Sequence, residues 1–338
     1  MIITLCCGIG LTSFFGYSSS MAANAAGETL RIGPASPETR QEALQLAMRD
    51  LAAENRDRYV SVLAAGMSSG DVPPEGLLEA RRGGRLVGAL FSQAQGGRSA
   101  VVWPPRIVSG EPAATAGQLL AAASELLAHQ GVCAAHALLE TVTEADDVAL
   151  RASGFEPLAE LIYLMSLEET FPRERPVGAI DFEPYCPANH DRLVRVVEAT
   201  YERTLDCPQL DGVRDTEDVL AGYRATGTFD PARWLIVQHQ GHDVGCLLLA
   251  DHPQDESWEL VYMGLIVSAR GRGWGRHIAR YAQWLTSQAG RPRLVVAVDA
   301  ANAPATRMYL AVGFQVCDRR SVYLKTFRNE SGCSCDAE

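Results

Sequence analysis

The sequence has no excess of basic residues. Its 338 residues include 30 Lys and Arg against 41 Asp and Glu, which gives a net charge of −11 at pH 7. Proteins whose main partner is nucleic acid present a basic surface to the phosphates. We therefore expect no nucleic-acid partner, and the negative charge favours cationic amines as ligands.

The nine cysteines lack the spacing of a metal site or of a disulfide framework. Only Cys6-Cys7 and Cys333-x-Cys335 are close in sequence, and neither pair has a second pair at zinc-site spacing. An odd number of scattered cysteines fits the reduced thiols of the cytoplasm. We expect no metal site and a cytoplasmic protein.

Residues 1–27 lack the basic segment of a secretory signal. Ile2 to Tyr17 are largely apolar, but the first Lys or Arg is Arg31. The apolar run is also short for a membrane span. Met21 opens a stretch typical of an ordinary N-terminus. We interpret residues 1–27 as an over-extended start or a dispensable leader, and we expect no membrane partner.

The apolar periodicity from Leu30 onward predicts alternating strands and helices, which is the pattern of an α/β fold. A chain of this length suggests roughly two domains; nothing in the sequence indicates an oligomeric state. The segment from Pro172 to Pro176 is the expected linker. The expected strands before it are residues 30–33, 77–80, 85–93, 99–103, 134–140 and 158–167, and the expected helices are residues 37–54, 116–129 and 144–152.

The second half of the chain repeats the first. Ile107-Val108-Ser109 recurs as Ile266-Val267-Ser268, and the same offset of 159 residues (107 to 266) carries Gly154-Phe155 onto Gly313-Phe314. An unchanged offset over nearly fifty residues indicates one fold present twice. We expect domains at residues 28–170 and 171–326, followed by a polar tail at residues 327–338.

A glycine-dense turn follows the apolar segment from Ser257 to Val267. It reads Arg270-Gly271-Arg272-Gly273-Trp274-Gly275, and residues with helical spacing follow it. Such a loop presents backbone N–H groups at the positive N-terminus of a helix, where phosphate binds. Taken alone, the pattern is also that of a tight turn.

A second motif lies directly after the expected strand Leu294 to Val298. It reads Asn302-x-x-Ala305-x-x-x-Tyr309-x-x-x-Gly313-Phe314. With both motifs in order, the chain from residue 179 to 326 resembles the GNAT (Gcn5-related N-acetyltransferase) superfamily, whose acetyl-CoA loop has the form Arg/Gln-x-x-Gly-x-Gly/Ala. The resemblance implies two tandem GNAT folds, each a mixed, mostly antiparallel twisted sheet flanked by helices.

The resemblance also implies where acetyl-CoA, the co-substrate, binds. Its pantetheine arm is expected along the strand before the loop, at Met263, Gly264, Leu265 and Val267. Its pyrophosphate is expected at Arg270, Gly271, Arg272, Gly273, Trp274 and Gly275, with Asn302 nearby, where Asn302 also suits a helix N-cap. The chain departs from the family in having Val267-Ser268-Ala269 in place of a proline-containing loop.

The first half has lost these features. At the same offset, the loop residues Arg270, Gly271, Gly273 and Gly275 are replaced by Glu111, Pro112, Ala114 and Ala116. Proline has no N–H to offer, and a carboxylate repels phosphate. Thr143 and Leu150 stand where Asn302 and Tyr309 stand in the second half. We expect a degenerate N-terminal domain and a catalytic C-terminal one, the layout of tandem-domain members of the family.

Two residues are candidates for the proton transfers. Tyr309 matches the family tyrosine that gives a proton to the departing thiolate; the alternative is a half-buried core tyrosine. Glu259 stands where several members carry a base, and strand alternation predicts that it shares a face with Val261, Met263 and Leu265. A solvated glutamate near a strand end is the other interpretation of Glu259.

The acceptor is expected beside the segment from Tyr201 to Arg214, which forms one wall of the acceptor cleft in the family. Asp206 and Asp211, near Tyr201, are plausible partners for an amine. The predicted function is transfer of the acetyl group of acetyl-CoA to a primary amine of a small molecule or protein, by direct attack in a ternary complex. The alternative is a non-catalytic acyl-CoA-binding regulatory protein; a tRNA-dependent aminoacyl transferase is disfavoured by the acidic composition.

Overall fold

The computed structural model describes residues 29–210 and 215–327. The expected leader and nearly all of the polar tail lie outside these ranges, as does Asp211. Within the described ranges, no helix combines the length and the apolar composition that crossing a membrane requires. The chain forms two compact units, the N-unit of residues 29–157 and 322–327 and the C-unit of residues 158–321.

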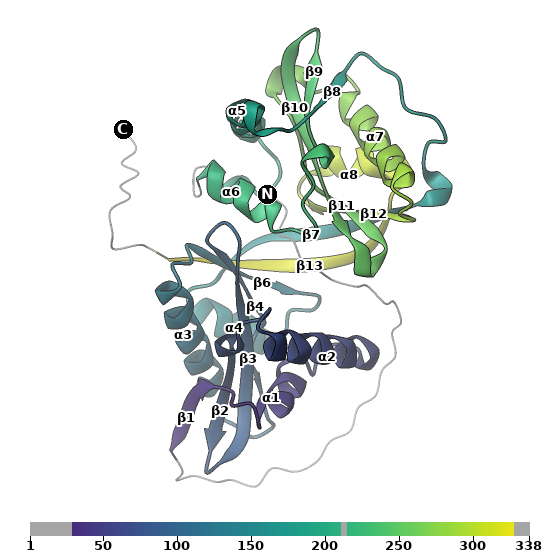
Figure 1. Ribbon diagram of the computed structural model, residues 1–338. Coiled ribbons are helices and arrows are strands. Elements are labelled where there is room, and N and C mark those ends of the chain that lie inside the picture. The colour runs from purple at the N-terminus through teal and green to yellow at the C-terminus, as the bar shows by residue number, and fades with distance from the viewer. Residues whose placement is uncertain (1–28, 211–214, 328–338) are drawn as a thin grey trace, which may run out of the picture. The chain divides into compact units, whose positions relative to one another are not determined.

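The N-unit is a sheet with helices on both faces (Figure 1). The sheet order is β1-β2-β3-β4-β6, and β5 pairs with β3. Alternate residues serve the two faces: Leu77 packs with α1 and α2, whereas Leu78 packs with α3. The elements of the first half of the sequence are β1 (Leu30–Pro34), α1 (Arg40–Ala47), α2 (Ala53–Ser69), β2 (Leu77–Arg82), β3 (Arg85–Gln95), β4 (Ser99–Val102), β5 (Arg106–Ile107), α3 (Ala114–His129), β6 (Ala134–Leu139), α4 (Glu144–Ala152) and β7 (Glu156–Leu167).

One expected helix differs from the structure. The segment 37–54, expected as a single helix, contains α1 and the start of α2, and α2 continues to Ser69. Gly66 lies inside α2, where glycine lowers helix propensity. Packing explains it, because a Cβ at Gly66 would lie 2.6 Å from the Cγ2 atom of Val72.

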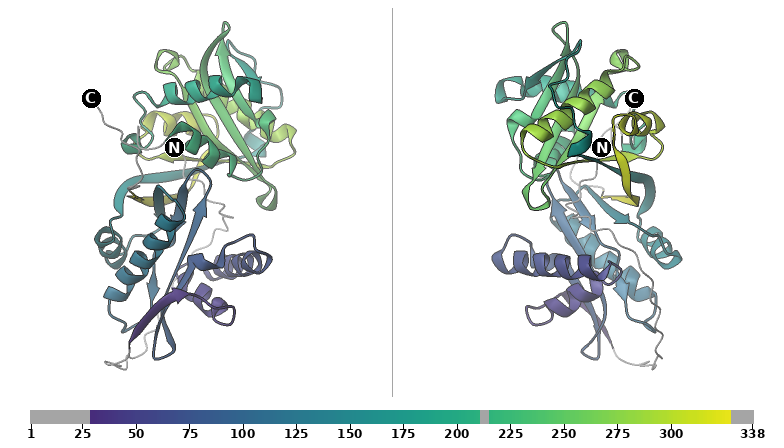
Figure 2. Two further views of the ribbon diagram at one scale, coloured as in Figure 1. Left: turned by 60° about the vertical axis from the view of Figure 1, so that its left-hand side comes forward. Right: turned by 90° about the vertical axis from the view of Figure 1, so that its right-hand side faces the viewer.

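The C-unit follows the same plan (Figure 1 and Figure 2). α5 and α6 cover one face of its sheet through Leu193, Val197 and Leu220, each fully buried. α7 packs on β10, β11 and β12. The elements are β8 (Asp181–Pro184), α5 (His190–Tyr201), α6 (Thr216–Arg224), β9 (Trp234–His239), β10 (His242–His252), β11 (Ser257–Leu265), α7 (Trp274–Gln288), β12 (Arg293–Asp299), α8 (Ala303–Leu310) and β13 (Gln315–Thr326).

Apart from the two-residue strand β5, both halves of the sequence have the same order of elements: a strand, two helices, three strands, a helix, a strand, a helix and a strand. The parallel pairs repeat as well, since Ser99↔Ala134 joins β4 to β6 and Ser257↔Arg293 joins β11 to β12. The mixed sheet flanked by helices confirms the expected fold class.

The last strand of each half is divided between the two units. β7 belongs to the first half by sequence, yet its residues from Leu158 lie in the C-unit, where it pairs antiparallel with β12 from Leu161↔Asp299 to Leu167↔Arg293. β13 belongs to the C-unit up to Ser321 and to the N-unit thereafter. The units therefore divide at residue 157, whereas the sequence repeat divides near residue 170.

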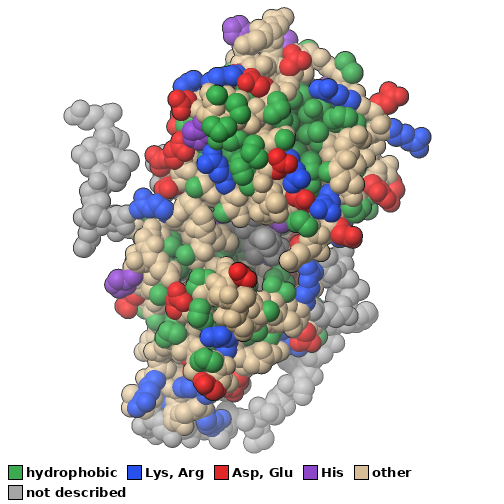
Figure 3. Space-filling view, in the orientation of Figure 1, with side chains coloured by type: hydrophobic (Ala, Val, Ile, Leu, Met, Phe, Trp, Pro, Cys, Tyr) green, Lys and Arg blue, Asp and Glu red, His purple; other side chains and the backbone are tan. Residues whose placement is uncertain are grey.

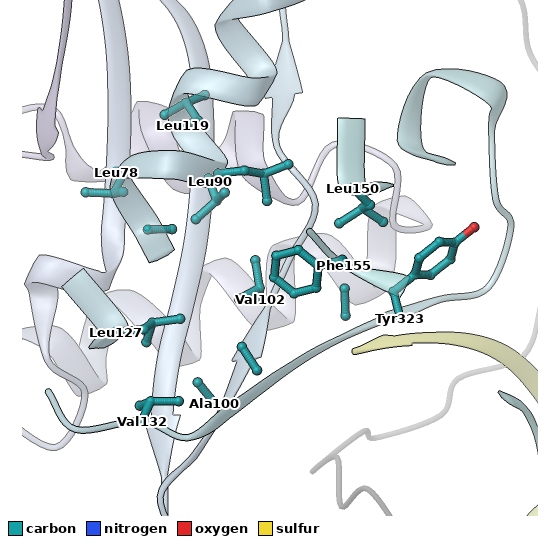
Figure 4. Packing of buried hydrophobic residues seen from close by; sticks show 14 of the residues in the cluster. Leu78, Leu90, Ala100, Val102, Leu119, Leu127, Val132, Leu150, Phe155 and Tyr323 are labelled. Atoms are coloured by element: carbon teal, nitrogen blue, oxygen red, sulfur yellow. The ribbon is translucent and has the colours of Figure 1, made fainter. Parts of the chain in front are cut away.

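The core of the N-unit includes residues from the end of the chain. Tyr323 packs in the same cluster as Leu150 and Phe155 (Figure 4), and its hydroxyl donates a hydrogen bond to Asp147 Oδ1 at 2.6 Å. On the face drawn in Figure 3, Lys and Arg side chains are interspersed with Asp and Glu. That face offers no broad basic surface.

Candidate active site

The two central strands of the C-unit, β11 and β12, pair only at their beginnings. Their parallel ladder contains Ser257↔Arg293, Trp258↔Leu294 and Glu259↔Val295. β11 continues to Leu265, so residues 260–265 lie beyond this ladder. An extended ligand can hydrogen-bond to such a strand edge as an additional strand would. Of the expected pantetheine residues, Met263, Gly264 and Leu265 lie in this part of β11. The expectation that Val267 lies on the same strand is wrong, because the strand ends at Leu265 and Val267 begins a short 3-10 helix (Val267–Ala269).

A β-bulge causes part of this geometry. The register between β10 and β11 shifts at Leu248/Leu249, which pair with Tyr262 and Leu260 and leave Val261 as the extra residue. A bulge bends its strand and increases the local twist. β11 is therefore deflected just beyond its last pair with β12.

The bulge overturns one expectation about Glu259. Glu259 pairs with Ala250, and Met263 pairs with Leu247. Cross-strand partners share a face, and residues 247 and 250 lie on opposite faces of β10. The prediction that Glu259 and Met263 share a face is therefore wrong, because simple alternation does not hold across the extra residue Val261.

The glycine loop lies between β11 and α7. Gly271 and Gly273 have positive φ angles of 75° and 80°. Gly273 is the N-cap of α7 and supplies no side-chain cap. Left-handed residues in such a loop turn successive N–H groups toward one point, next to the positive end of the helix dipole. No atom lies within 4 Å of a Cβ built on either glycine, so the loop is open on that side.

The side chain of Arg270 holds this loop in place. Its guanidinium donates to the carbonyl oxygens of Leu265 at 2.9 Å, Thr200 at 2.8 Å and Arg203 at 3.0 Å. Two of these carbonyls lie at the C-terminal end of α5, where a positive charge is favourable. Since the guanidinium is engaged with these carbonyls, the backbone N–H groups of the loop are the donors that could meet an anion there. Arg272, which is exposed, lies over the Trp274 ring at 5.2 Å.

Asn302 and Tyr309 lie on either end of α8. The Asn302 side-chain oxygen accepts from the Ala305 N–H at 3.2 Å, which makes Asn302 the N-cap. Tyr309 is only 4% exposed, and its ring packs edge-on against Phe314 with centroids 5.2 Å apart. Burial first, and then the charge of Asp206, raises the pKa of the Tyr309 phenol well above its ordinary value. The phenol therefore stays protonated at neutral pH.

Asp206 fastens the loop after α5 to the end of β12. Its Oδ1 accepts from the Asp299 N–H at 2.9 Å, and Asp299 Oδ2 accepts from the Cys207 N–H at 3.0 Å. This docking brings the Asp206 carboxylate close enough to affect Tyr309. The hydroxyl of Tyr201 lies 3.4 Å from that of Tyr223. The structure thus places Asp206 beside the candidate acid, with Tyr201 on the adjoining helix.

Glu259 has a partner that the sequence did not suggest. Its Oε2 lies 2.9 Å from His252 Nε2, and the two side chains are 12% and 9% exposed. His252 ends β10 and pairs with Ser257 across the turn, so Glu259 is its diagonal neighbour on the same face. A prediction of a β-hairpin over residues 242–265 would have placed His252 next to Glu259. Glu259 is thus not the solvated residue of the alternative interpretation.

The corresponding loop of the N-unit is filled by its own side chains. Glu111 Oε1 accepts from Arg82 at 2.7 Å and from the Thr115 hydroxyl at 2.6 Å. These contacts, led by the Arg82 hydrogen bond, lower the pKa of Glu111. Thr143 caps α4 and Leu150 is fully buried. Within residues 29–210 and 215–327, no cluster of His, Cys, Asp and Glu suits a metal ion.

Comparison with known proteins identifies the second half of the chain. Residues 197–314 match the acetyltransferase (GNAT) family model. Mycothiol acetyltransferase from Thermomonospora curvata is 31% identical over 99 residues, which covers 29% of this chain and 33% of that protein. The match thus spans about a third of the length of this curated relative.

Solved structures show the same fold. A GCN5-related N-acetyltransferase from Sphaerobacter thermophilus superposes with a TM-score of 0.61 at 15% identity, over 89% of this chain and 96% of that one. A glucosamine N-acetyltransferase region of a fungal GH3 β-N-acetylglucosaminidase gives 0.58 at 14% identity, over 88% and 38%. The chain has the fold of GNAT proteins and carries a GNAT-family acetyltransferase domain in its C-terminal region.

Proposed function

We propose that the protein is an N-acetyltransferase that uses acetyl-CoA to acetylate a primary amine of a small molecule or protein, with the C-unit as the active part. The observation that carries this proposal is the open glycine loop at the uncapped N-terminus of α7, directly after the deflected part of β11. This arrangement suits a ligand with a pyrophosphate at one end and an extended amide-containing arm at the other.

The residues present fit acetyl-CoA. The backbone N–H groups from Gly271 to Gly275 face the pyrophosphate, and Met263 to Leu265 bind the pantetheine arm. When bound, acetyl-CoA supplies the thioester that the amine attacks, so that the amide C–N bond forms and the C–S bond breaks. Glu259 takes the proton of the ammonium group, directly or through water, which leaves the amine lone pair free to attack.

Tyr309 gives its phenolic proton to the departing sulfur. Its raised pKa supports this role, because a group that is protonated at neutral pH is ready to donate. Asp206 fixes the loop after α5 beside Tyr309 through Asp299, and its negative charge near Tyr309 favours a cationic acceptor.

The contrast between the units supports a single acetyl-CoA site. In the N-unit the Glu111 carboxylate, held by Arg82 and Thr115, lies in the loop that corresponds to Arg270 to Gly275. It is only 5% exposed, so an incoming phosphate would have to displace a buried negative charge. Pro112 removes one N–H donor as well.

A broad screen of amines tests the proposal. The full chain is incubated with acetyl-CoA and a panel that includes small amines, amino sugars such as glucosamine, and lysine peptides, and thiol release is followed with a chromogenic disulfide. We expect amine-dependent release, accompanied by acetylated product in mass spectrometry. Acetyl-CoA binding in calorimetry without release by any amine would favour the alternative, a non-catalytic acyl-CoA-binding regulatory protein.

A further inference from the structure

We propose that the proton acceptor of this site is a pair, Glu259 with His252, in which the imidazole N–H of His252 orients the carboxylate and the protonation of His252 sets the acid limit of activity. The inference rests on the proposed acetyl transfer. His252 acts through Glu259 and is therefore a positioning residue. Its contact with the site is the 2.9 Å hydrogen bond between its Nε2 atom and Glu259 Oε2.

The burial of the pair argues against a surface ion pair. The side chains of His252 and Glu259 are 9% and 12% exposed. A pair so shielded from water interacts more strongly than an exposed one and holds both groups in one geometry. By contrast, His190 and Glu217, in the same unit and also 2.9 Å apart, are 25% and 59% exposed.

The backbone after α6 is shaped around the imidazole. A Cβ on Gly227 would lie 3.0 Å from His252 Cε1 and 2.6 Å from the Asp251 carbonyl oxygen. Gly227 also has a positive φ of 54°, a conformation that glycine adopts without strain. Close packing of a backbone turn against one side of the ring fixes its orientation toward Glu259.

The pair lies where the proposed chemistry needs it. Glu259 is the last residue of β11 that pairs with β12, so it marks the point from which the two strands separate. The pantetheine arm is expected to enter from the glycine loop along residues 265 to 260 and to carry its thioester toward this point. Glu259 is then the carboxylate of β11 that the acceptor meets at the inner end of the arm.

The proton balance is simple. The ammonium group loses one proton to the Glu259 carboxylate, whose Oε2 atom keeps the hydrogen bond from the His252 Nε2–H, and the carboxylic acid then releases the proton to water. No bond to carbon changes at either side chain. The pair returns to its starting state when the carboxylic acid has lost that proton.

The titratable groups next to the pair in sequence have partners of their own. On β10 the neighbouring Asp251 points to the opposite face and is bound by Arg291 and Arg233. On β11 the phenol of Tyr262 donates to or accepts from Thr200 Oγ1 at 2.7 Å, and α6 contributes the phenol of Tyr223. Burial raises the pKa of both phenols well above the ordinary value, so neither titrates near neutral pH.

The test compares pH profiles of kcat/KM for the full-length protein and His252→Gln. Glutamine keeps a hydrogen-bond donor for Glu259, but unlike an imidazole it does not take up a proton in this pH range. We expect the plateau to fall roughly tenfold and the acid limb to move to lower pH by more than one unit, because protonating a carboxylate alone requires more acid than protonating an imidazole. Glu259→Gln should lower the plateau at least a hundredfold.

The matched control is His190→Gln, which removes the imidazole of the exposed pair and should leave the profile unchanged. An acid limb of His252→Gln identical to that of the wild type, with the wild type active, overturns the pair and leaves the acetyltransferase standing. A Glu259→Gln variant as fast as the wild type also overturns it. A wild type that binds acetyl-CoA but acetylates no amine overturns the proposed function and the pair together. Thermal melts of each variant identify any loss of folding.

Discussion

At the scale of single residues, the proposed chemistry depends most on the environment of one phenol. Tyr309 is buried, packs on Phe314, and lies near enough to Asp206 for that charge to raise its pKa. Burial disfavours the phenolate, so the residue donates a proton readily only to a strong base such as a departing thiolate, and must recover it afterwards. This is the behaviour of an acid that acts late in the reaction.

Replacing Tyr309 by Phe removes the proton and keeps the ring. We expect turnover to fall by about 10²-fold or more, while the affinity for acetyl-CoA and the stability change little. Thiol-release kinetics and calorimetry measure the two quantities. Tyr281→Phe is the control, since Tyr281 is another buried tyrosine of the C-unit, stacked on Phe182 at 3.8 Å. Normal turnover of Tyr309→Phe would make Tyr309 a core residue.

Glu111 allows a test of how firmly the N-unit loop is closed. The hydrogen bond from Arg82 lowers the pKa of Glu111 in the folded protein. The ionised carboxylate therefore contributes its full stabilisation above the unfolded-state pKa, and this stabilisation is lost as the pH falls through the folded-state pKa. Glu111→Gln should cost about 1–2 kcal/mol of unfolding free energy at pH 7 and less at pH 3, where protonation of the carboxyl group reduces its contribution. Urea titrations at both pH values measure this difference.

The control for that experiment is Glu156→Gln in the same unit. Glu156 is 73% exposed and lies 3.5 Å from Arg151, so its removal should have little effect at either pH. An equal loss for Glu111→Gln at pH 3 and pH 7 would show that the cost comes from packing rather than from the ionised carboxylate.

Some residue roles follow from sequence and others depend on tertiary contacts. The N-cap at Asn302 and the position of Tyr309 on α8 are local properties of one motif, and the structure has both as the motif predicts. The contacts of Arg270 cannot be predicted from its neighbours in sequence, because its guanidinium binds carbonyls at the end of α5, some seventy positions earlier in the chain. His252 was missed for a similar reason, since its contact with Glu259 exists only once the hairpin is folded.

At the scale of elements, the glycine loop and the β-bulge together shape the proposed cofactor site. The loop was predictable, because glycines at fixed spacing before a helix signal left-handed backbone. The bulge at Val261 was not, since an extra residue leaves no mark in a run of apolar side chains. It changed which face Glu259 occupies, which is the reason that strand alternation failed there.

Gly273→Val tests the loop as an anion site. Valine is strained at a φ of 80°, and its side chain would project into the open space where the pyrophosphate is expected. We expect acetyl-CoA binding to weaken at least tenfold, about 1.4 kcal/mol, as measured by calorimetry. The control is Gly241→Val in the turn between β9 and β10, which has a φ of 75° and equally open surroundings. Similar weakening by both variants would point to general strain.

At the scale of the whole chain, the repeat was visible in the sequence, but the pairing of β7 with the sheet of the C-unit was not. An offset between matching residues shows where each copy begins, but it does not say which sheet the final strand joins. Consecutive strands usually pair with sequence neighbours, which is why a division near residue 170 was the natural expectation. β7 instead pairs with β12, and the C-unit begins at Leu158.

The pairing of β7 with β12 leads to a prediction about fragments of the chain. A fragment of residues 158–321 keeps β7 beside β12, whereas residues 171–321 lack it. Leu161, Ile162 and Leu164 are at most 5% exposed, and each contributes about 1.5–3 kcal/mol through burial, so their loss approaches the whole stability of an ordinary domain.

We therefore expect 158–321 to bind acetyl-CoA in calorimetry and to show a cooperative thermal transition, and 171–321 to do neither. The two fragments share the glycine loop, Asn302, Tyr309 and Glu259, so a difference between them cannot come from the proposed site residues themselves. It would come from β12, which β7 supports and which ends at Asp299. Asp299 in turn holds both the loop that contains Asp206 and the start of α8. Equal binding by both fragments would mean that β12 holds its position without β7, and that the boundary near residue 170 suffices for a working domain.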